Sequence, residues 1–406
     1  MMFTEAYLEE HTSANPFLKE KAAKARKIFT NIKDHKPGPD ETVLLRNDDI
    51  KTASESPSPI ETTIENQEQL KEKGIIIGSF EEIAKTHPKL INTHLMSIIK
   101  PEENKLAALH FSIIKEGTII YIPQNITITE TIKIKTHLKA KTLFKHMLII
   151  AEKLTEVSII EEITADKETE FYSNFVEITV QEGANVMYGV IQSLPEDCIN
   201  TGIRRANVQK NANMNFVTGD FGSKTTRTLT ETCLVEDGSS STNYGFFFGK
   251  NKQKYHFYAN TLHDAQHTNC DMATRGALEN GAESSYRGLV NIPQHAQHTR
   301  GYQKTKTMLL SKDAIANAIP SLEIDNCHVR ASHEATVGQI DKEKLFYMMS
   351  RGMNEEEARS LLVRVFFAEI LKKVKNKYVN GRIQSYIDKE VHCALVDELE
   401  KTVVEI

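Results

Sequence analysis

The sequence predicts a mainly β core flanked by helical N- and C-terminal regions, and the pattern of the central region is the main reason. Between about residues 105 and 335, apolar and polar residues alternate, as in Ile126-Thr127-Ile128-Thr129, and this period of two is typical of half-buried strands. Similar turn phrases follow such runs: Glu182-Gly183-Ala184, Glu236-Asp237-Gly238-Ser239 and Glu279-Asn280-Gly281-Ala282. A repeated strand and turn without helical inserts indicates a β-solenoid or a β-sandwich.

Residues 1–104 are expected to form an N-terminal helical region that contains a connector. Ser79 and Glu82 have the spacing of a capping box, which marks the start of a helix. The stretch from about 52 to 69 is rich in Ser, Pro, Thr and Glu and has few large apolar residues. Because such a composition buries little apolar surface, we expect a mobile linker there.

Residues 336–406 are predicted to be helical again, after a β core at 105–335. Asn354 followed by Glu357 is typical of a helix N-terminus. Apolar residues then recur every four positions, at Leu362, Phe366, Ile370 and Val374. This stripe is expected to cover an edge of the β region or to face a partner.

Composition excludes several classes of protein. The 406 residues carry 50 Lys+Arg and 55 Asp+Glu, a formal charge of −5, so a generic basic nucleic-acid binder is not expected. No apolar run has the length of a membrane span, and the start MMFTEAYLEEHTS is acidic and polar, unlike a signal peptide. The five cysteines are scattered without a CxxC pair, at Cys198, Cys233, Cys270, Cys327 and Cys393. We therefore expect a cytoplasmic protein without a disulfide scaffold, a membrane or a nucleic-acid partner.

Two groups of residues resemble familiar sites only in part. His263, His267 and Cys270 have the ligand types of a zinc site. On one strand, however, His263 and His267 would share a face that Cys270 does not, and no fourth ligand is evident. They are either a metal site or polar strand residues.

The segment Gly245–Lys250 resembles a phosphate-binding loop but has the wrong spacing, with Asn251 in place of Ser or Thr. No nucleotide is expected on this chain.

Two further positions carry reactive groups. Cys233 lies in the strand-like phrase Glu231-Thr232-Cys233-Leu234-Val235 and is either a small core residue or a reactive thiol. In Ser332-His333-Glu334, an imidazole and a carboxylate are adjacent, and both groups can bind iron. Neighbouring strand residues point to opposite faces, so His333 and Glu334 can serve one site only at a bend or a subunit boundary. The alternative is a surface pair.

The region around this pair resembles the SufB/SufD family of iron–sulfur cluster assembly scaffolds. The resemblance rests on a long compound motif: Pro320-Ser321-Leu322-Glu323-Ile324, the run Ser332 to Asp341, Leu345-Phe346-Tyr347, and Ser350-Arg351-Gly352-Met353. Supporting phrases extend it over most of the chain: Gly78 to Ala84, Gly117 to Pro123, Ser285 to Val290, and Met308 to Ser311.

The resemblance implies a right-handed parallel β-helix and a non-catalytic scaffold subunit that carries a transient iron–sulfur cluster. It also implies three kinds of partner: a SufC-type ABC ATPase, a second SufB/SufD-type core subunit in a homo- or heterodimer, and a sulfur donor protein. The ATPase would dock on the C-terminal helical domain, at Leu345, Phe346, Tyr347 and Arg351. The two core subunits would meet at the C-terminal ends of their β-helices.

Individual positions follow the family unevenly. His333 matches a histidine that SufB and SufD share at the proposed assembly site, and Glu334 matches SufB. Cys233 falls near the SufB cysteine that is thought to accept sulfur. Two family cysteines are replaced here by Thr305 and Ala331. A purely structural SufD-like subunit that binds no cluster is therefore an alternative.

A β-solenoid enzyme acting on polysaccharide is a further alternative from a different class. Such enzymes need grouped carboxylates, and Asp264, Asp271 and Glu283 are available. No paired-carboxylate phrase stands out among them.

Overall fold

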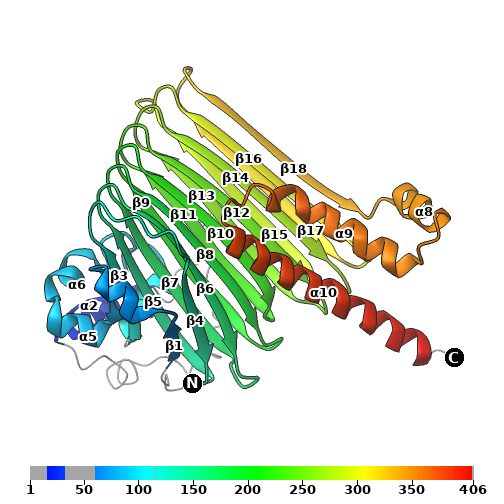
Figure 1. Ribbon diagram of the computed structural model, residues 1–406, viewed down its shortest axis with the longest axis horizontal. Helices are drawn as coiled ribbons and strands as arrows, with labels where there is room; N and C mark the ends of the chain where they lie inside the picture. Colours follow the sequence, from blue (N-terminus) through cyan, green and yellow to red (C-terminus); the bar gives the residue numbers. More distant parts are fainter. Residues whose placement is uncertain (1–15, 33–59, 115, 405–406) are drawn as a thin grey trace.

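The computed structural model describes residues 16–32, 60–114 and 116–404, in which two nine-stranded sheets form the body of the molecule (Figure 1). Sheet A runs in the order β1 (Ile60–Ile64), β4 (Ile132–Leu138), β6 (Glu156–Ala165), β8 (Asn185–Leu194), β10 (Asn213–Gly222), β12 (Ser240–Gly249), β14 (Asn269–Leu278), β16 (Arg300–Leu309) and β18 (Arg330–Gln339). Sheet B runs in the order β17 (Ile315–Ile324), β15 (Glu283–Ile292), β13 (Lys254–His263), β11 (Thr225–Leu234), β9 (Ile199–Val208), β7 (Phe171–Val180), β5 (Thr142–Ala151), β3 (Glu116–Ile122) and β2 (Ile76–Ser79).

Successive strands from β3 onward alternate between the two sheets, and each pairs in parallel with the strand two places along the chain. Every coil therefore gives one strand to each sheet, which is a parallel β-solenoid. The prediction of a mainly β core is confirmed, and the sandwich alternative is wrong because sandwiches are built from antiparallel sheets. Among the strands of the described ranges, only β1 and β2 pair antiparallel, with β4 and β3, at the N-terminal end.

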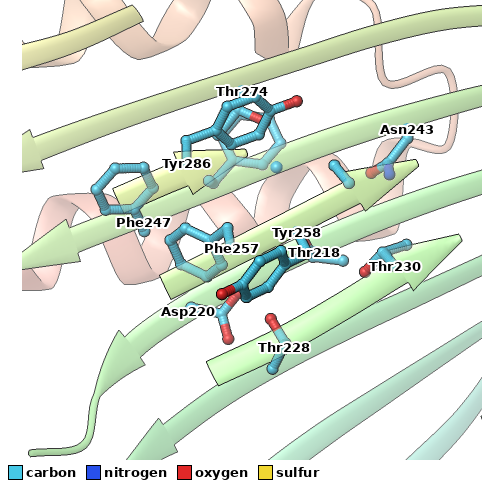
Figure 2. A pocket seen from close by; sticks show the side chains of 13 residues that line it. Thr218, Asp220, Thr228, Thr230, Asn243, Phe247, Phe257, Tyr258, Thr274 and Tyr286 are labelled. Atoms are coloured by element: carbon cyan, nitrogen blue, oxygen red, sulfur yellow. The ribbon is translucent and has the colours of Figure 1, made fainter. Parts of the chain in front are cut away.

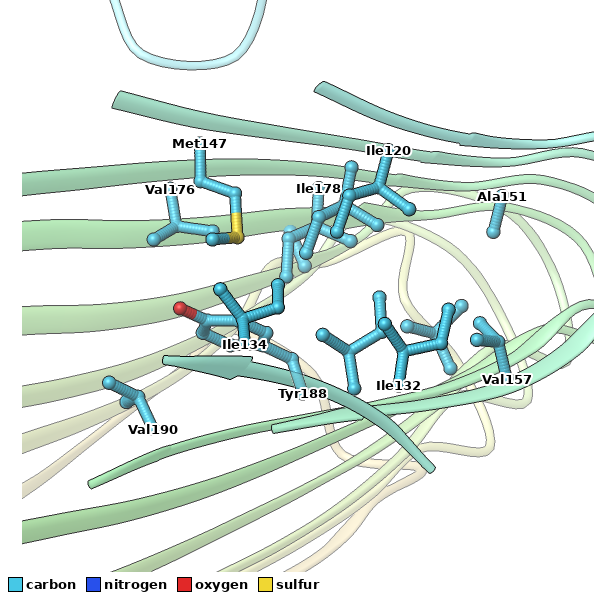
Figure 3. Packing of buried hydrophobic residues seen from close by; sticks show 14 of the residues in the cluster. Ile120, Ile132, Ile134, Met147, Ala151, Val157, Val176, Ile178, Tyr188 and Val190 are labelled. Atoms are coloured by element: carbon cyan, nitrogen blue, oxygen red, sulfur yellow. The ribbon is translucent and has the colours of Figure 1, made fainter. Parts of the chain in front are cut away.

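The inner faces of the first coils form a mainly hydrophobic core. Side chains such as Ile120, Ile134 and Ile178 are completely or almost completely buried and point toward one another across the two sheets (Figure 3). The alternation in the sequence explains this core, since every second residue of a strand points inward.

The helices α2 (Pro16–Ile32), α5 (Phe80–Thr86), α6 (Pro88–His94) and α7 (Lys105–Ile113) pack on the outer face of sheet B beside β5 and β7. Leu70 of α4 (Gln67–Glu72) packs instead into the core between the sheets. Ser79 accepts a hydrogen bond of 3.2 Å from the Glu82 amide, as the capping box predicts. The linker prediction is wrong for residues 60–69, which form β1 and the start of α4. The alternating phrase from Ile60 to Ile64 pairs with β4 despite its polar surroundings, while residues 52–59 lie outside the described ranges.

A buried carboxylate fastens this region to the solenoid. Glu177 on the outer face of β7 accepts hydrogen bonds from the amides of Met96 (2.8 Å), Ile98 (2.7 Å) and Ile99 (3.0 Å). The His146 Nε2 atom lies 3.1 Å from the same carboxylate, and both side chains are fully buried.

We expect Glu177→Gln to destabilise the protein by about 1–3 kcal/mol, because an amide cannot satisfy three buried donors as a carboxylate does. Urea unfolding of the full chain measures this free energy. Glu182→Gln is the control, since Glu182 makes only an exposed pair with Lys153 and its loss should leave the unfolding midpoint unchanged. Equal midpoints for the two variants would show that Glu177 does not hold the N-terminal region.

The C-terminal helices are α8 (Lys342–Ser350), α9 (Glu355–Leu371) and α10 (Lys377–Val404), and α9 and α10 lie across the outer face of sheet A (Figure 1). Asn354 and Glu357 form the predicted capping box. The buried face of α9 is centred on Val363, Phe367 and Ile370, whereas the predicted Phe366 is only half-buried. Among the described helices, none is both long and apolar enough to cross a membrane.

Candidate functional site

The C-terminal end of the solenoid is uncovered, because β17 and β18 are the last strands of their sheets. In β18, the amides of Arg330 and Ile340 donate to Thr299 and Leu309 on the β16 side. Backbone groups alternate in direction along a strand, so the even-numbered residues of β18 bond to β16 and the odd-numbered ones face the free edge. In β17 the pattern is reversed, and Pro320 lies at a free-edge position, where its missing N–H costs no bond within the sheet.

His333 and Glu334 lie at the middle of this free strand, on opposite faces. His333 pairs in register with the buried, inward-facing Gln303 of β16, so its imidazole belongs to the inner face of the last coil. The side chain is nevertheless exposed, because no further coil covers it. Glu334 pairs in register with Lys304 and lies on the outer face. The structure therefore agrees with the geometric expectation that one subunit alone cannot bring both side chains to the same site.

Glu334 is held by two lysines of the neighbouring strand. Its carboxylate lies 2.9 Å from the ammonium of Lys304 and 3.3 Å from that of Lys306. The hydrogen bond from Lys304, followed by that from Lys306, lowers the pKa of Glu334 below its usual value. The carboxylate is thus ionised at neutral pH, as a metal ligand must be, but it must leave its lysines to bind an ion.

The interior of the coils that precede His333 is polar, a feature that the alternation of apolar and polar residues does not predict. Thr218, Thr228, Thr230 and Thr274 line an internal cavity together with Asp220 and aromatic rings (Figure 2). About 20 Å³ of it is open to the centre of a water-sized sphere, which is room for an ordered water. Burial raises the pKa of Asp220, against the influence of Arg204. The sequence of β11, TTRTLTETCL, indicates this polar interior, because every second residue, a threonine or at the end a leucine, points inward.

Cys233 occupies the other face of the same strand. Its neighbours in β11, Thr232 and Leu234, are buried inside the solenoid, so the Cys233 side chain points outward, where it is half-buried. Burial, followed by the negative charge of Glu231, raises the pKa of the thiol to about 12. In this state Cys233 is a protonated thiol that lies away from the interior.

The three residues considered as a zinc site are separated by the fold. His263 and Cys270 meet inside the solenoid, with Nε2 and Sγ 3.4 Å apart. His267 lies in the intervening turn and stacks on His298 outside. Burial lowers the pKa of His263 to about 4 and raises that of Cys270 to about 12, so the buried pair is neutral. Within the described residues no three His, Cys, Asp or Glu side chains are placed to hold one metal ion.

The residues considered as an ATPase dock lie on an exposed helix. No side chain of α8 is buried, and Phe346 and Tyr347 are 73% and 58% exposed. The Arg351 guanidinium lies 5.2 Å from the centre of the Tyr347 ring, and Leu345 is half-buried. In Figure 1, α8 projects beyond the end of β18. Exposed aromatic residues next to an arginine are typical of the centre of a protein interface.

The carboxylates considered for a polysaccharide enzyme do not form a catalytic pair. Asp264 follows β13 and pairs with His295, while Glu283 begins β15 and pairs with Lys254 at the opposite end of the strands. Asp271 lies on the outer face of β14 and pairs with Lys373. Each carboxylate therefore has its own basic partner in a different part of the surface.

Comparison with known proteins gives a consistent result over most of the chain. The family profile described as "SUF system FeS cluster assembly, SufBD core domain" matches residues 134–366, and that described as "SufBD protein N-terminal region" matches residues 60–134. A protein of Staphylococcus epidermidis (strain ATCC 12228) named iron–sulfur cluster assembly SufBD family protein is 29% identical over 316 residues, which is 77% of this chain and 68% of the relative. A protein of Staphylococcus aureus (strain MRSA252), also named as a SufBD family protein, is 30% identical over the same lengths.

Proposed function

Because the chain belongs to the SufBD family of iron–sulfur cluster assembly proteins, we propose that it is a non-catalytic core subunit of a SufBCD-type scaffold in the cytoplasm. It would pair with a second core subunit, bind a SufC-type ATPase that hydrolyses ATP, receive sulfur from a donor protein, and pass finished clusters to apoproteins. Four of its cysteines are free thiols in the described residues, which agrees with a reducing compartment.

The uncovered last coil is the observation that carries this proposal. A ten-residue strand with one unpaired edge, β18, is exposed along its length, and proteins normally cover such an edge. Apolar side chains surround it: Ile315, Ile319, Ile324 and Val337 are all more than one-third exposed. A second core subunit that pairs with this edge would enclose His333 in the resulting seam.

The chemistry of the seam then depends on both subunits. The His333 imidazole and the Glu334 carboxylate are iron ligands in their neutral and ionised forms, but they lie on opposite faces of one strand. Ala331 and Thr305 supply no thiolate on this side. The second subunit would therefore contribute the thiolates that hold the cluster cargo.

Cys233 remains our candidate for carrying sulfur, but its thiol must first lose its proton. Cys233 would accept sulfur by attack of its thiolate on the outer sulfur of a donor persulfide, which breaks the donor's S–S bond and releases the donor thiolate. The pKa of Cys233, raised to about 12 by burial and then by Glu231, keeps the resting thiol protonated. A donor protein that exposes the thiol or neutralises Glu231 would lower this pKa.

Anaerobic reconstitution tests the proposal. The chain is co-expressed with a SufC-type ATPase and a second core subunit, and cluster formation is followed by iron–sulfur absorption. We expect His333→Ala to slow cluster formation by at least tenfold, while His87→Ala, which removes an exposed histidine far from the seam, leaves the rate unchanged. Cluster formation at the full rate in His333→Ala would refute the ligand role of His333.

The ATPase dock gives a separate prediction. We expect the double variant Phe346→Ala/Tyr347→Ala to weaken ATPase binding by about 30-fold or more, because central aromatic residues of interfaces contribute about 2 kcal/mol or more. Calorimetric titration of the core with the ATPase measures this. Leu154→Ala removes an apolar side chain that is 62% exposed elsewhere and should have no effect. Unchanged affinity in the double variant would place the dock elsewhere.

The replacement of two family cysteines by Ala331 and Thr305 favours a second candidate function. In that case the chain would be a SufD-like structural partner that stabilises a SufB-type subunit and binds no cluster. Absence of iron–sulfur absorption from this chain in every pairing, with assembly intact, would support this role over cluster ligation.

A further inference from the structure

The turns that lead from sheet B to sheet A stack along one side of the solenoid, and each turn before the last has a residue with a left-handed backbone. Along the chain these residues are Asn125, Leu154, Gly183, Asn211, Gly238, His267 and His298, with φ between 54° and 73°. The amide of each donates to a carbonyl of the next turn, for example His267 to Gln297 and His298 to His328. Glycine and asparagine suit this conformation best, yet the last two of these positions are histidines.

These histidines form a continuous column with the final turn. The rings of His267 and His298 stack with centroids 4.9 Å apart and an angle of 16° between planes. The ring centroid of His328 lies 6.2 Å from that of His298, and the Cys327 Sγ atom lies 3.8 Å from His328 Nδ1. All four side chains are exposed, and Cys327 is the only exposed thiol among the cysteines whose side chains are described.

We propose that Cys327, His328, His298 and His267 form a surface binding site for a divalent transition-metal ion of the Zn²⁺ class. One thiolate and three imidazoles are the donor types that such ions prefer. In the described part of the chain no three ligand groups yet converge on one point. The rings must therefore rotate toward the ion, which costs little for exposed side chains on turns about 4.8 Å apart.

Packing of the turns against one another does not by itself explain why these positions carry three histidines and a cysteine. Gly183, Asn211 and Gly238 close the preceding turns of the column without an imidazole, so the fold itself requires no histidine there. Leu154 also adopts this conformation, with a φ of 57°, and histidine is among the residues that tolerate it, so the backbone neither requires nor excludes an imidazole at these turns. The adjacent thiol of Cys327 also adds nothing to a packing role. This site is separate from His333, which lies within β18 rather than in a turn.

The fold provides a conservative variant for the test. His267→Asn/His298→Asn places at both positions the residue that the equivalent turn already has at Asn211, so the turns should form normally, as circular dichroism checks. The full chain is titrated with Zn²⁺ alone by calorimetry, and the rate of Cys327 alkylation by iodoacetamide is measured by peptide mass spectrometry with and without Zn²⁺. His87→Asn, an exposed histidine outside the column, is the matched control.

We expect the wild-type chain and His87→Asn to bind one Zn²⁺ per chain, and the ion to slow Cys327 alkylation at least tenfold. In the double variant, Zn²⁺ should bind at least tenfold more weakly and leave the alkylation rate unchanged. Equal affinities in wild type and double variant, or alkylation of wild-type Cys327 that Zn²⁺ does not slow, would overturn the proposal. Neither result would bear on the role of His333 in the seam.

Discussion

Ala335→Pro should separate the core subunits while leaving each one folded. Ala335 is an odd-numbered residue at the middle of β18, so its N–H faces the free edge and makes no bond to β16. Proline is tolerated at such positions of an edge strand. A second subunit that adds to the edge would lose one donor and meet the proline ring. We expect the dissociation constant of the core pair to rise about 10- to 100-fold, since each lost hydrogen bond contributes about 0.5–1.5 kcal/mol and the ring adds a clash.

Light scattering of the assembled core as a function of concentration measures this dissociation. Ala335→Ser is the control, because it keeps the edge N–H and should pair normally. Unchanged far-ultraviolet circular dichroism would confirm that the proline leaves the solenoid intact. A core that stays paired in Ala335→Pro would contradict edge-to-edge assembly through β18.

Lys145→Met should cause the largest loss of stability. Lys145 and Glu161 form an ion pair inside the first coils, with 2% and 0% of their side chains exposed. Thr136 and Tyr188 also donate to Glu161, at 2.8 Å and 2.7 Å. Removing the ammonium leaves an uncompensated carboxylate among apolar residues, which costs about 3–5 kcal/mol. Urea unfolding of the full chain at neutral pH measures the change.

The pH dependence and a second variant distinguish this mechanism from a simple packing defect. Burial alone would raise the pKa of Glu161, but Lys145 and the hydroxyl donors outweigh it and lower the pKa. In the wild-type chain, the ionised Glu161 thus stabilises the folded state at pH values above its unfolded pKa of about 4.3. This stabilisation is lost as the pH falls through the lower pKa of the folded state. Without Lys145, burial should raise the folded pKa, so the deficit of Lys145→Met should shrink as the pH falls toward 4. Lys145→Met/Glu161→Leu should recover most of the lost stability. A deficit that is independent of pH would indicate a packing defect instead.

The sequence was sufficient to predict the solenoid but not the contents of its interior. The alternation in runs such as Ile126–Thr129 indicates which residues share a face, but not whether that face is inner or outer. Cys233 shows the consequence, because its strand places the threonines inside and the thiol outside. The fold likewise separates His267 from His263 and Cys270, since a turn that the spacing did not reveal intervenes after β13.

The helical ends show a second kind of limit. The capping box at Asn354 is a local signal and was read correctly. The apolar stripe of α9 was predicted correctly at Ile370, but its first positions, Leu362 and Phe366, lie one residue before the buried Val363 and Phe367, because adjacent apolar residues fit either stripe. The strand from Ile60 to Ile64 was missed because its stability comes from pairing with β4, a contact between distant parts of the sequence.

Hydrogen exchange of β18 in the assembled core tests the central claim most directly. The amides of residues 331, 333, 335, 337 and 339 have no partner within sheet A, by the alternation that starts at Arg330. If the second core subunit covers this edge and encloses His333, exchange at residues 331, 333, 337 and 339 should be slowed at least tenfold in the wild-type core relative to the unpaired Ala335→Pro chain, which has no amide hydrogen at 335. An assembled core in which the peptide spanning residues 330–340 exchanges as fast as in the unpaired chain would contradict the account.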